Sequence, residues 1–542
     1  MIECQISQRG RVPGKEIGTA QQVLKPTKPC CNLAAMIADI HFQAVQINLV
    51  IPKRLAVMDQ GWGNGISAQT HAVTNHLPEQ NAVRPIVEQR GCCAHSVRGK
   101  GARRKPLVKL GGDQGGSIRI PAAFSGVFGI KPTYGVVPAY PQTVMGTLSH
   151  QGPLARTVGD AALVLDALKD PELGYFDPRD IYTAVPGALV STEPYASFTV
   201  SENPSDRSEK RLAGMRIGIV REYMVKHTLN DAAISDQIDN EIKTVLRDQL
   251  GANLVESVDP LYPDDPTVPN MEYTFQDALA EILPIHMPEY FSKTTDSGAL
   301  EFAVPGHDVT TKRYLVQVGE GKVPLSPNLN LRRVSRAPPT RSFAFHIDQY
   351  LDRRGDERVK DMASLNANTK YFSDVARAGS ENWVAVDDIS SDGNTERMKM
   401  REVMRLVLVK VMRENRLDVL VNPENTVPHQ KLGGPSEPSV NGRSASGATQ
   451  AITALLGVPE IVVPAGFNQV VYEPRFVLNA ARNDYNAVTG DARSLLDTPL
   501  PVSMMFWAGP GDEAAVLKAA SAYEAATRHR LPPPAFGPLP GE

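Results

Sequence analysis

The chain has 542 residues, of which 42% are hydrophobic and 22% charged, so it can bury a large core and extensive disorder is not expected. Its formal net charge of −3 gives no reason to expect nucleic acid or an anionic membrane as a partner. Met1 is not followed by an apolar signal-peptide stretch, and no run approaches the ~18 apolar residues of a membrane-spanning helix. These features predict a cytoplasmic protein.

Charge and cysteine are distributed unevenly along the chain. Up to residue 109 there are 15 Lys and Arg against 6 Asp and Glu, and the remainder is acidic. The five cysteines all fall in the first 93 residues: Cys4, Cys30, Cys31, Cys92 and Cys93. Adjacent cysteines lack the C-x₂-C spacing that lets two thiolates share one zinc ion. We therefore expect reduced thiols, with no metal and no cofactor.

The first 106 residues show poor apolar periodicity. They suggest one helix, over 31–40, and one strand, over 46–52. An amphipathic helix is then predicted over 156–170, with Thr157 as its N-cap. A strand at 215–220, a helix at about 231–250 ended by Gly251, and a strand at 253–258 follow. This β-α-β order implies two parallel strands with a right-handed crossover.

The alternation of helix and strand returns later in the chain. Helices are predicted at 395–415, 446–456 and 512–528, and strands at 418–423, 459–466 and 501–507. The stretch 300–340 reads as a long surface excursion. Alternation of this kind predicts an α/β fold whose sheet is covered by helices on both faces.

The most informative stretch is "LVKLGGDQGGSIRIPAAFSGVFGIKPTYG", residues 107–135. Glycine costs conformational entropy, so a glycine-rich turn before Ser117 implies a backbone shape that side chains would prevent. Such a turn can aim several N–H groups at one point and so hold an anion or an oxyanion. Three interpretations remain open on these residues: a nucleophilic serine with its oxyanion hole, a structural turn, or a phosphate-binding loop without the usual G-x-x-x-x-G-K-[ST] spacing.

The segment "GGDQGGSIRIPAAFSGVFGIKPTYGVVP" closely resembles the core of the amidase signature family. Similar segments follow at 148–168, 457–467 and 500–534, so the resemblance extends from about 107 to 535 and is weaker over 180–410. It implies a single large mixed sheet with helices on both faces. It divides the chain into an atypical segment 1–106, an amidase signature domain 107–535 and a tail 536–542.

The resemblance also implies the chemistry. Ser117 would be the nucleophile that forms an acyl-enzyme from a carboxylic acid amide, releasing ammonia or an amine. The backbone around Gln114, Gly115, Gly116 and Ser117 would form the oxyanion hole. Asp113 and Arg119 would hold the loop or help to seat substrate, with a plain ion pair as the alternative for Arg119. Lys131 is expected to be structural rather than catalytic.

The family also implies a Ser–Ser–Lys relay, in which a neutral lysine takes the proton through a bridging serine. Its Gly-Gly-Ser-Ser and Lys-Asp motifs are not present upstream of Ser117. The place of the bridging serine falls near Cys93, with Ser96 the hydroxyl close by, and Lys25 and Lys28 lie near the place of the lysine without a following Asp. The relay serine and lysine are therefore not assigned.

Two explanations fit this mismatch: residues 1–106 are a wrong-frame or disrupted translation, or they are a genuine divergent segment. The first function hypothesis is an amidase acting on carbon–nitrogen bonds other than peptide bonds, with a small-molecule amide as partner and a homodimer left open. The alternative is a non-catalytic protein of the amidase fold, or an amidotransferase subunit.

Overall fold

The computed structural model describes residues 60–62, 66–68, 108–138, 148–169, 189–200, 210–259, 265–295, 297–334, 343–370, 393–429, 431, 435–440, 443, 447, 449, 451–480, 482 and 484–532. The helix predicted at 31–40 and the strand predicted at 46–52 lie outside these residues. Within the first 106 residues, strands β1 (Gln60–Trp62) and β2 (Ile66–Ala68) pair with each other in an antiparallel hairpin that is separate from the main sheet.

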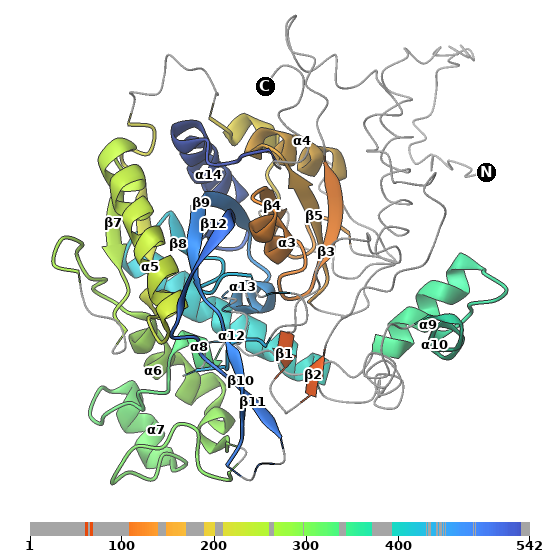
Figure 1. Cartoon of the computed structure of the whole chain (residues 1–542). Coiled ribbons are helices and arrows are strands. Elements are labelled where there is room, and N and C mark those ends of the chain that lie inside the picture. The colour runs from red at the N-terminus through yellow and green to blue at the C-terminus, as the bar shows by residue number, and fades with distance from the viewer. Residues whose placement is uncertain are drawn as a thin grey trace, which may run out of the picture.

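An eight-stranded mixed sheet forms the centre of the molecule (Figure 1). Its order is β3-β5-β4-β9-β12-β8-β6-β7. Only the pairs β8–β6 and β6–β7 are parallel. The strands are β3 (Lys109–Asp113), β4 (Phe128–Lys131), β5 (His150–Ala155), β6 (Arg216–Ile219), β7 (Asn253–Glu256), β8 (Val419–Pro423), β9 (Glu460–Tyr472) and β12 (Arg493–Trp507). The predicted β-α-β unit and the expected mixed α/β sheet are both confirmed.

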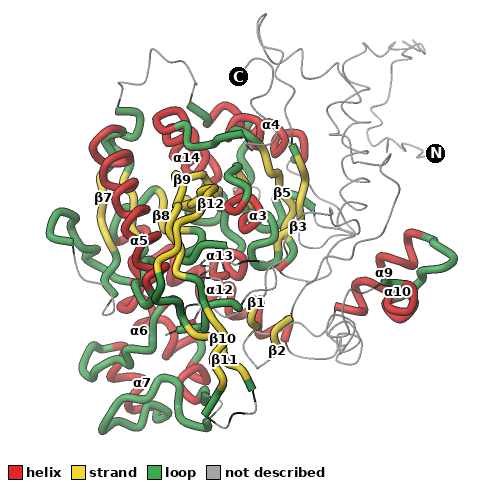
Figure 2. Tube along the Cα trace, in the orientation of Figure 1, coloured by secondary structure: helices red, strands yellow, loops and turns green. Residues whose placement is uncertain are grey.

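Helices cover both faces of this sheet (Figure 2). The helices next to the sheet are α3 (Arg119–Phe124), α4 (Val158–Leu168), α5 (Leu229–Glu241), α12 (Gly393–Glu414), α13 (Ala451–Leu456) and α14 (Glu513–Thr527). Farther out, α6 (Phe275–His286) packs on α12, α7 (Lys312–Gly319) packs on α6, and α8 (Leu331–Val334) lies beside the turn at Arg221–Tyr223. Helices α9 (Phe343–Arg354) and α10 (Met362–Asn368) pack on each other around a separate small apolar cluster, away from the sheet (Figure 1). Short 3₁₀ turns lie at Tyr195–Phe198, Arg221–Tyr223 and Pro288–Ser292.

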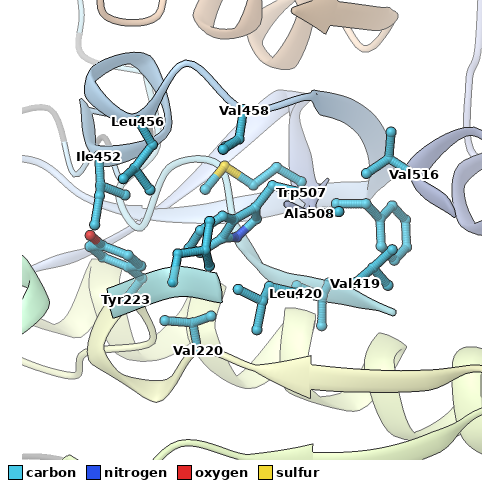
Figure 3. Packing of buried hydrophobic residues seen from close by; sticks show 14 of the residues in the cluster. Val220, Tyr223, Val419, Leu420, Ile452, Leu456, Val458, Trp507, Ala508 and Val516 are labelled. Atoms are coloured by element: carbon cyan, nitrogen blue, oxygen red, sulfur yellow. The ribbon is translucent and has the colours of Figure 1, made fainter. Parts of the chain in front are cut away.

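Neighbouring residues at the end of β12 show which helices share a face. The Phe506 ring contacts Tyr523 of α14, and the next residue, Trp507, lies close to Ile452 and Leu456 of α13 (Figure 3). Because successive strand residues point to opposite faces, α14 and α13 lie on opposite sides of the sheet. Hydrogen bonds join α4 and α5 to α14, and they join α3 and α12 to the α13 side.

Three differences from the predicted elements have local causes. The helix predicted at 231–250 changes at Ile242 into a π-helix, Ile242–Gln249, and ends before Gly251, whose φ is +79°. Strands β9 and β12 are longer than predicted because they pair with each other beyond the sheet and carry a second hairpin, β10 (Arg475–Leu478) and β11 (Tyr485–Val488). The described part of the predicted surface excursion at 300–340, residues 300–334, is not a simple surface excursion, because it contains α7 and α8 and buries residues such as Phe302, Leu329 and Leu331.

Candidate active site

The glycine-rich loop joins the edge strand β3 to the short helix α3. Asp113, the last residue of β3, is fully buried and its carboxylate accepts three backbone hydrogen bonds. The donors are the N–H groups of Gly115 at 3.0 Å, Gly116 at 2.7 Å and Ile118 at 3.1 Å. Gly116 has a φ of 139°, which a residue with a Cβ rarely adopts, so glycine at this position has a steric reason. The loop from Gly115 to Ile118 is thus held in place by hydrogen bonds to a single carboxylate.

Arg119, in the first turn of α3, connects this carboxylate to helix α13 and to strand β9 in the interior of the sheet. Its Nε and Nη2 donate to Asp113 at 2.9 and 2.8 Å, in a bidentate pair. Its Nη1 donates to Thr453 Oγ1 and to Glu460 Oε2, both at 2.7 Å. The Asp113, Arg119 and Glu460 side chains are completely excluded from solvent. These hydrogen bonds of Arg119 are all made within the protein, so they anchor the loop to α13 and β9.

Burial and charge together set the ionisation of this network. Burial alone would raise the pKa of Asp113, but the cation and hydrogen bonds of Arg119 outweigh it and hold that pKa well below its usual range. Burial lowers the pKa of Arg119, but the negative charges of Asp113 and Glu460 raise that pKa by more than burial lowers it. The guanidinium therefore stays charged. Burial raises the pKa of Glu460 despite the nearby Arg119.

Lys131, at the end of β4, is also fully buried beside this network. Its Nζ donates to the carbonyl oxygen of Thr453 at 3.2 Å and to that of Val458. Burial, together with repulsion from Arg119, lowers the pKa of Lys131 to about 7. One of these carbonyl groups belongs to α13 and the other to the connection between α13 and β9, so Lys131 links β4 to both.

Ser117 differs from the residues around it because its side chain is exposed, while Ile118, Arg119 and Ile120 are buried. Among the described residues, its Oγ has no hydrogen-bond partner, and the N–H groups of Gln114 and Ser117 have no acceptor. Two of the N–H groups expected to face an oxyanion, those of Gly115 and Gly116, donate to Asp113 instead. Of the four N–H groups expected in the oxyanion hole, those of Gln114 and Ser117 therefore remain as candidates.

Two buried titratable groups near the loop were not found by sequence reasoning. His150 lies opposite Asp113 in the β3–β5 register, and its Nδ1 lies 2.8 Å from the Leu148 carbonyl oxygen. Burial lowers the pKa of His150 well below its usual value, so the ring is neutral. Glu424, just after β8, is fully buried, and neither of its carboxyl oxygens has a hydrogen-bond partner among the described residues. Burial raises the pKa of Glu424, and Glu460 raises it further. His150 lies within the resembling segment 148–168 but was not singled out there, and Glu424 lies outside the resembling segments.

The upstream candidates cannot be placed beside Ser117. Lys25, Lys28, Cys93 and Ser96 all lie outside the described residues. Within the described part of the chain, no group of three or more His, Cys, Asp or Glu side chains could hold a metal ion. In the same residues, no helix is long and apolar enough to cross a membrane.

Comparison with known proteins shows which family the segment around this loop resembles. The family model described as Amidase matches residues 102–274, which confirms the resemblance to the amidase signature family. The chain is 38% identical over 149 residues to a glutamyl-tRNA(Gln) amidotransferase subunit of Cupriavidus taiwanensis, covering 27% of this chain and 28% of that protein. It is 37% identical over 169 residues to the protein of the same name from Paraburkholderia xenovorans, covering 31% of each.

The chain thus matches less than a third of the length of these curated relatives.

Among solved structures, the native peptide amidase from Stenotrophomonas maltophilia is similar with a TM-score of 0.43 and 20% sequence identity. That comparison covers 79% of this chain and 63% of the peptide amidase.

Proposed function

We propose that the chain is an amidase that hydrolyses a carboxylic acid amide, outside peptide bonds, through an acyl-enzyme on Ser117. The observation that carries this proposal is the braced loop, in which a single exposed serine stands on a backbone fixed by buried charges. The match of residues 102–274 to the Amidase family model supports the same reaction class. The amidase domain is proposed to span 107–535, with 1–106 and 536–542 outside it.

In the proposed reaction, Ser117 Oγ attacks the carbonyl carbon of the amide and its proton passes to a base. The carbonyl oxygen becomes an oxyanion, held by the N–H groups of Gln114 and Ser117. The C–N bond breaks, and the departing nitrogen takes a proton and leaves as ammonia or an amine. Water then attacks the ester of Ser117, releasing the acid and restoring the hydroxyl.

The roles of Asp113 and Arg119 in this proposal are positional. Asp113 holds Gly115, Gly116 and Ile118, and Arg119 holds Asp113. This leaves the loop with little freedom, so the N–H donors need not reorganise as charge develops on the substrate oxygen. The base would be the neutral lysine that the family resemblance implies, acting through a bridging serine, and it remains unassigned.

The direct test is the release of ammonia or amine from a panel of aliphatic, aromatic and peptide amides. Ser117→Ala should abolish hydrolysis, because removal of a catalytic serine costs on the order of 10⁶ in turnover. Ser125→Ala is the matched control, since Ser125 is an exposed serine at the other end of α3. Retention of activity within tenfold in Ser117→Ala would remove Ser117 from the mechanism.

The alternative is a non-catalytic protein of this fold or an amidotransferase subunit. The missing relay motifs favour a non-catalytic protein, and the names of the similar curated proteins favour an amidotransferase subunit. Translation of the gene upstream of codon 107 in its other two frames tests the origin of the mismatch. A Gly/Ser-rich loop and an upstream Lys-Asp in one frame would point to a disrupted reading frame, and unreadable frames would make 1–106 a genuine segment.

A further inference from the structure

The apolar surface best placed for an interaction lies on the sheet face opposite α14, across two packed helices. Helices α6 and α12 run antiparallel, because Glu281 pairs with Lys410 while Glu289, just past the end of α6, pairs with Lys399. Four large apolar side chains are exposed on them: Ile285 at 72%, Met398 at 52%, Leu406 at 49% and Val409 at 37%. We call these four residues the α6/α12 patch.

A groove of about 610 Å³ lies beside the patch. Ile282, Leu406 and Val409 supply its apolar lining, and Lys410, Arg413 and Glu414 line its charged side. An apolar centre with a charged rim is the usual anatomy of a protein–protein interface. The rim lysines Lys399 and Lys410 are already paired within the chain, so covering the patch would not leave them without a counter-charge.

The order of residues along α12 indicates which partner fits. Residues Glu402, Leu406, Val409 and Arg413 follow at helical spacings of four, three and four, so they form one stripe. A two-fold axis between Leu406 and Val409, with two copies of α12 antiparallel, places Leu406 opposite the second copy's Val409. The same axis places Glu402 opposite the second copy's Arg413, twice. The stripe is therefore complementary to itself.

The axis would also bring Arg405 opposite Lys410 of the other copy, which is the one unfavourable pairing near the centre. Both cations are held within their own chain. Arg405 Nε donates to the Leu456 carbonyl oxygen at 2.6 Å, and its Nη1 lies 3.4 Å from Glu402 of the same helix. Lys410 pairs with Glu281. Two-fold dimers are the commonest soluble oligomers, and each uses the same patch on both copies.

We propose that the α6/α12 patch is the interface of a two-fold homodimer, with α12 packed against α12 of a second copy. The proposal is independent of the amidase activity, because none of these residues belongs to the nucleophile loop or its brace. It predicts that the full chain has twice the mass of its 58.9 kDa monomer in solution.

Light scattering and sedimentation of the full chain over a range of concentrations test the proposal. Ile285→Glu combined with Leu406→Glu should raise the dimer dissociation constant at least about tenfold, as for central interface residues. The matched control, called the arm variant, combines Phe476→Glu on β10 with Leu495→Glu on the outer part of β12, at residues that are similarly exposed but lie far from the patch in sequence and on other elements. Circular dichroism and the unfolding midpoint show that each variant is folded.

A charge exchange gives a second test that does not depend on apolar residues. Glu402→Arg alone and Arg413→Glu alone should each weaken the dimer, and the two together should restore part of it, because the new charges again face their opposites while Arg405 loses its own pair with Glu402. A monomeric wild-type chain at all concentrations would overturn the proposal. Dissociation by the arm variant and not by the patch variant, or failure of the double exchange to restore any part of the dimer, would overturn this placement of the interface.

Discussion

Replacing Arg119 with Met tests whether the buried brace holds the nucleophile loop. The substitution keeps an unbranched side chain in α3 but leaves the Asp113 and Glu460 carboxylates buried without their shared cation. Removing one member of a buried ion pair typically costs about 3–5 kcal/mol, and two carboxylates are stranded here. With a urea m-value of about 3–4 kcal/mol/M for a chain of this size, the unfolding midpoint should fall by about 1 M.

The assay is urea unfolding followed by tryptophan fluorescence, and the matched control is Arg247→Met. Arg247 forms an exposed pair with Asp248, so its loss should change the free energy of unfolding by less than about 0.5 kcal/mol. Adding Glu460→Gln to Arg119→Met should recover part of the loss, because one stranded carboxylate becomes neutral. A midpoint for Arg119→Met within about 0.2 M of the wild type would refute the idea that this network fixes the loop.

Two further predictions concern the same region. Gly116→Ala should destabilise the protein by about 1–3 kcal/mol, since its φ of 139° strains a residue with a Cβ. Gly159→Ala, in open space within α4, should instead be neutral or stabilising in a thermal melt. Because burial lowers the pKa of Lys131 to about 7, the unfolded chain binds more protons between pH 7 and 10. The free energy of unfolding should therefore rise with pH across that window, and Lys131→Met should reduce the rise; an unchanged slope would show that Lys131 is not buried in neutral form.

Sequence patterns predicted those elements whose signals, such as a capping residue or an apolar run, lie close together in the chain. Thr157 caps α4 as predicted, its side chain accepting a hydrogen bond from the Asp160 N–H. The β6-α5-β7 unit was predicted from two short apolar runs with a helical stretch between them that ends at Gly251. The π-helix at Ile242–Gln249 was not predictable, because side-chain spacing does not specify how the backbone hydrogen bonds of the last turns are arranged.

In the candidate site, too, the residues close together in sequence were predictable and the distant ones were not. The loop at 113–119 is visible as a motif because its glycines, its aspartate and its serine are neighbours in sequence. Thr453 and Glu460, which complete the brace, lie 334 and 341 residues from Arg119. Within "GVPEIVVPAGF", Glu460 reads as a charge at the start of a strand, and only the pairing of β4 with β9 brings it beside Lys131.

The central claim is that Ser117 is a nucleophile, and covalent labelling measures this most directly. The full chain is incubated with a fluorophosphonate, which forms a stable bond with activated serine hydroxyls, and the modified peptide is identified by mass spectrometry. The account predicts one adduct, on Ser117, that persists in Ser125→Ala and disappears in Ser117→Ala. An adduct on another residue, or an unmodified Ser117 in a folded chain, would contradict it.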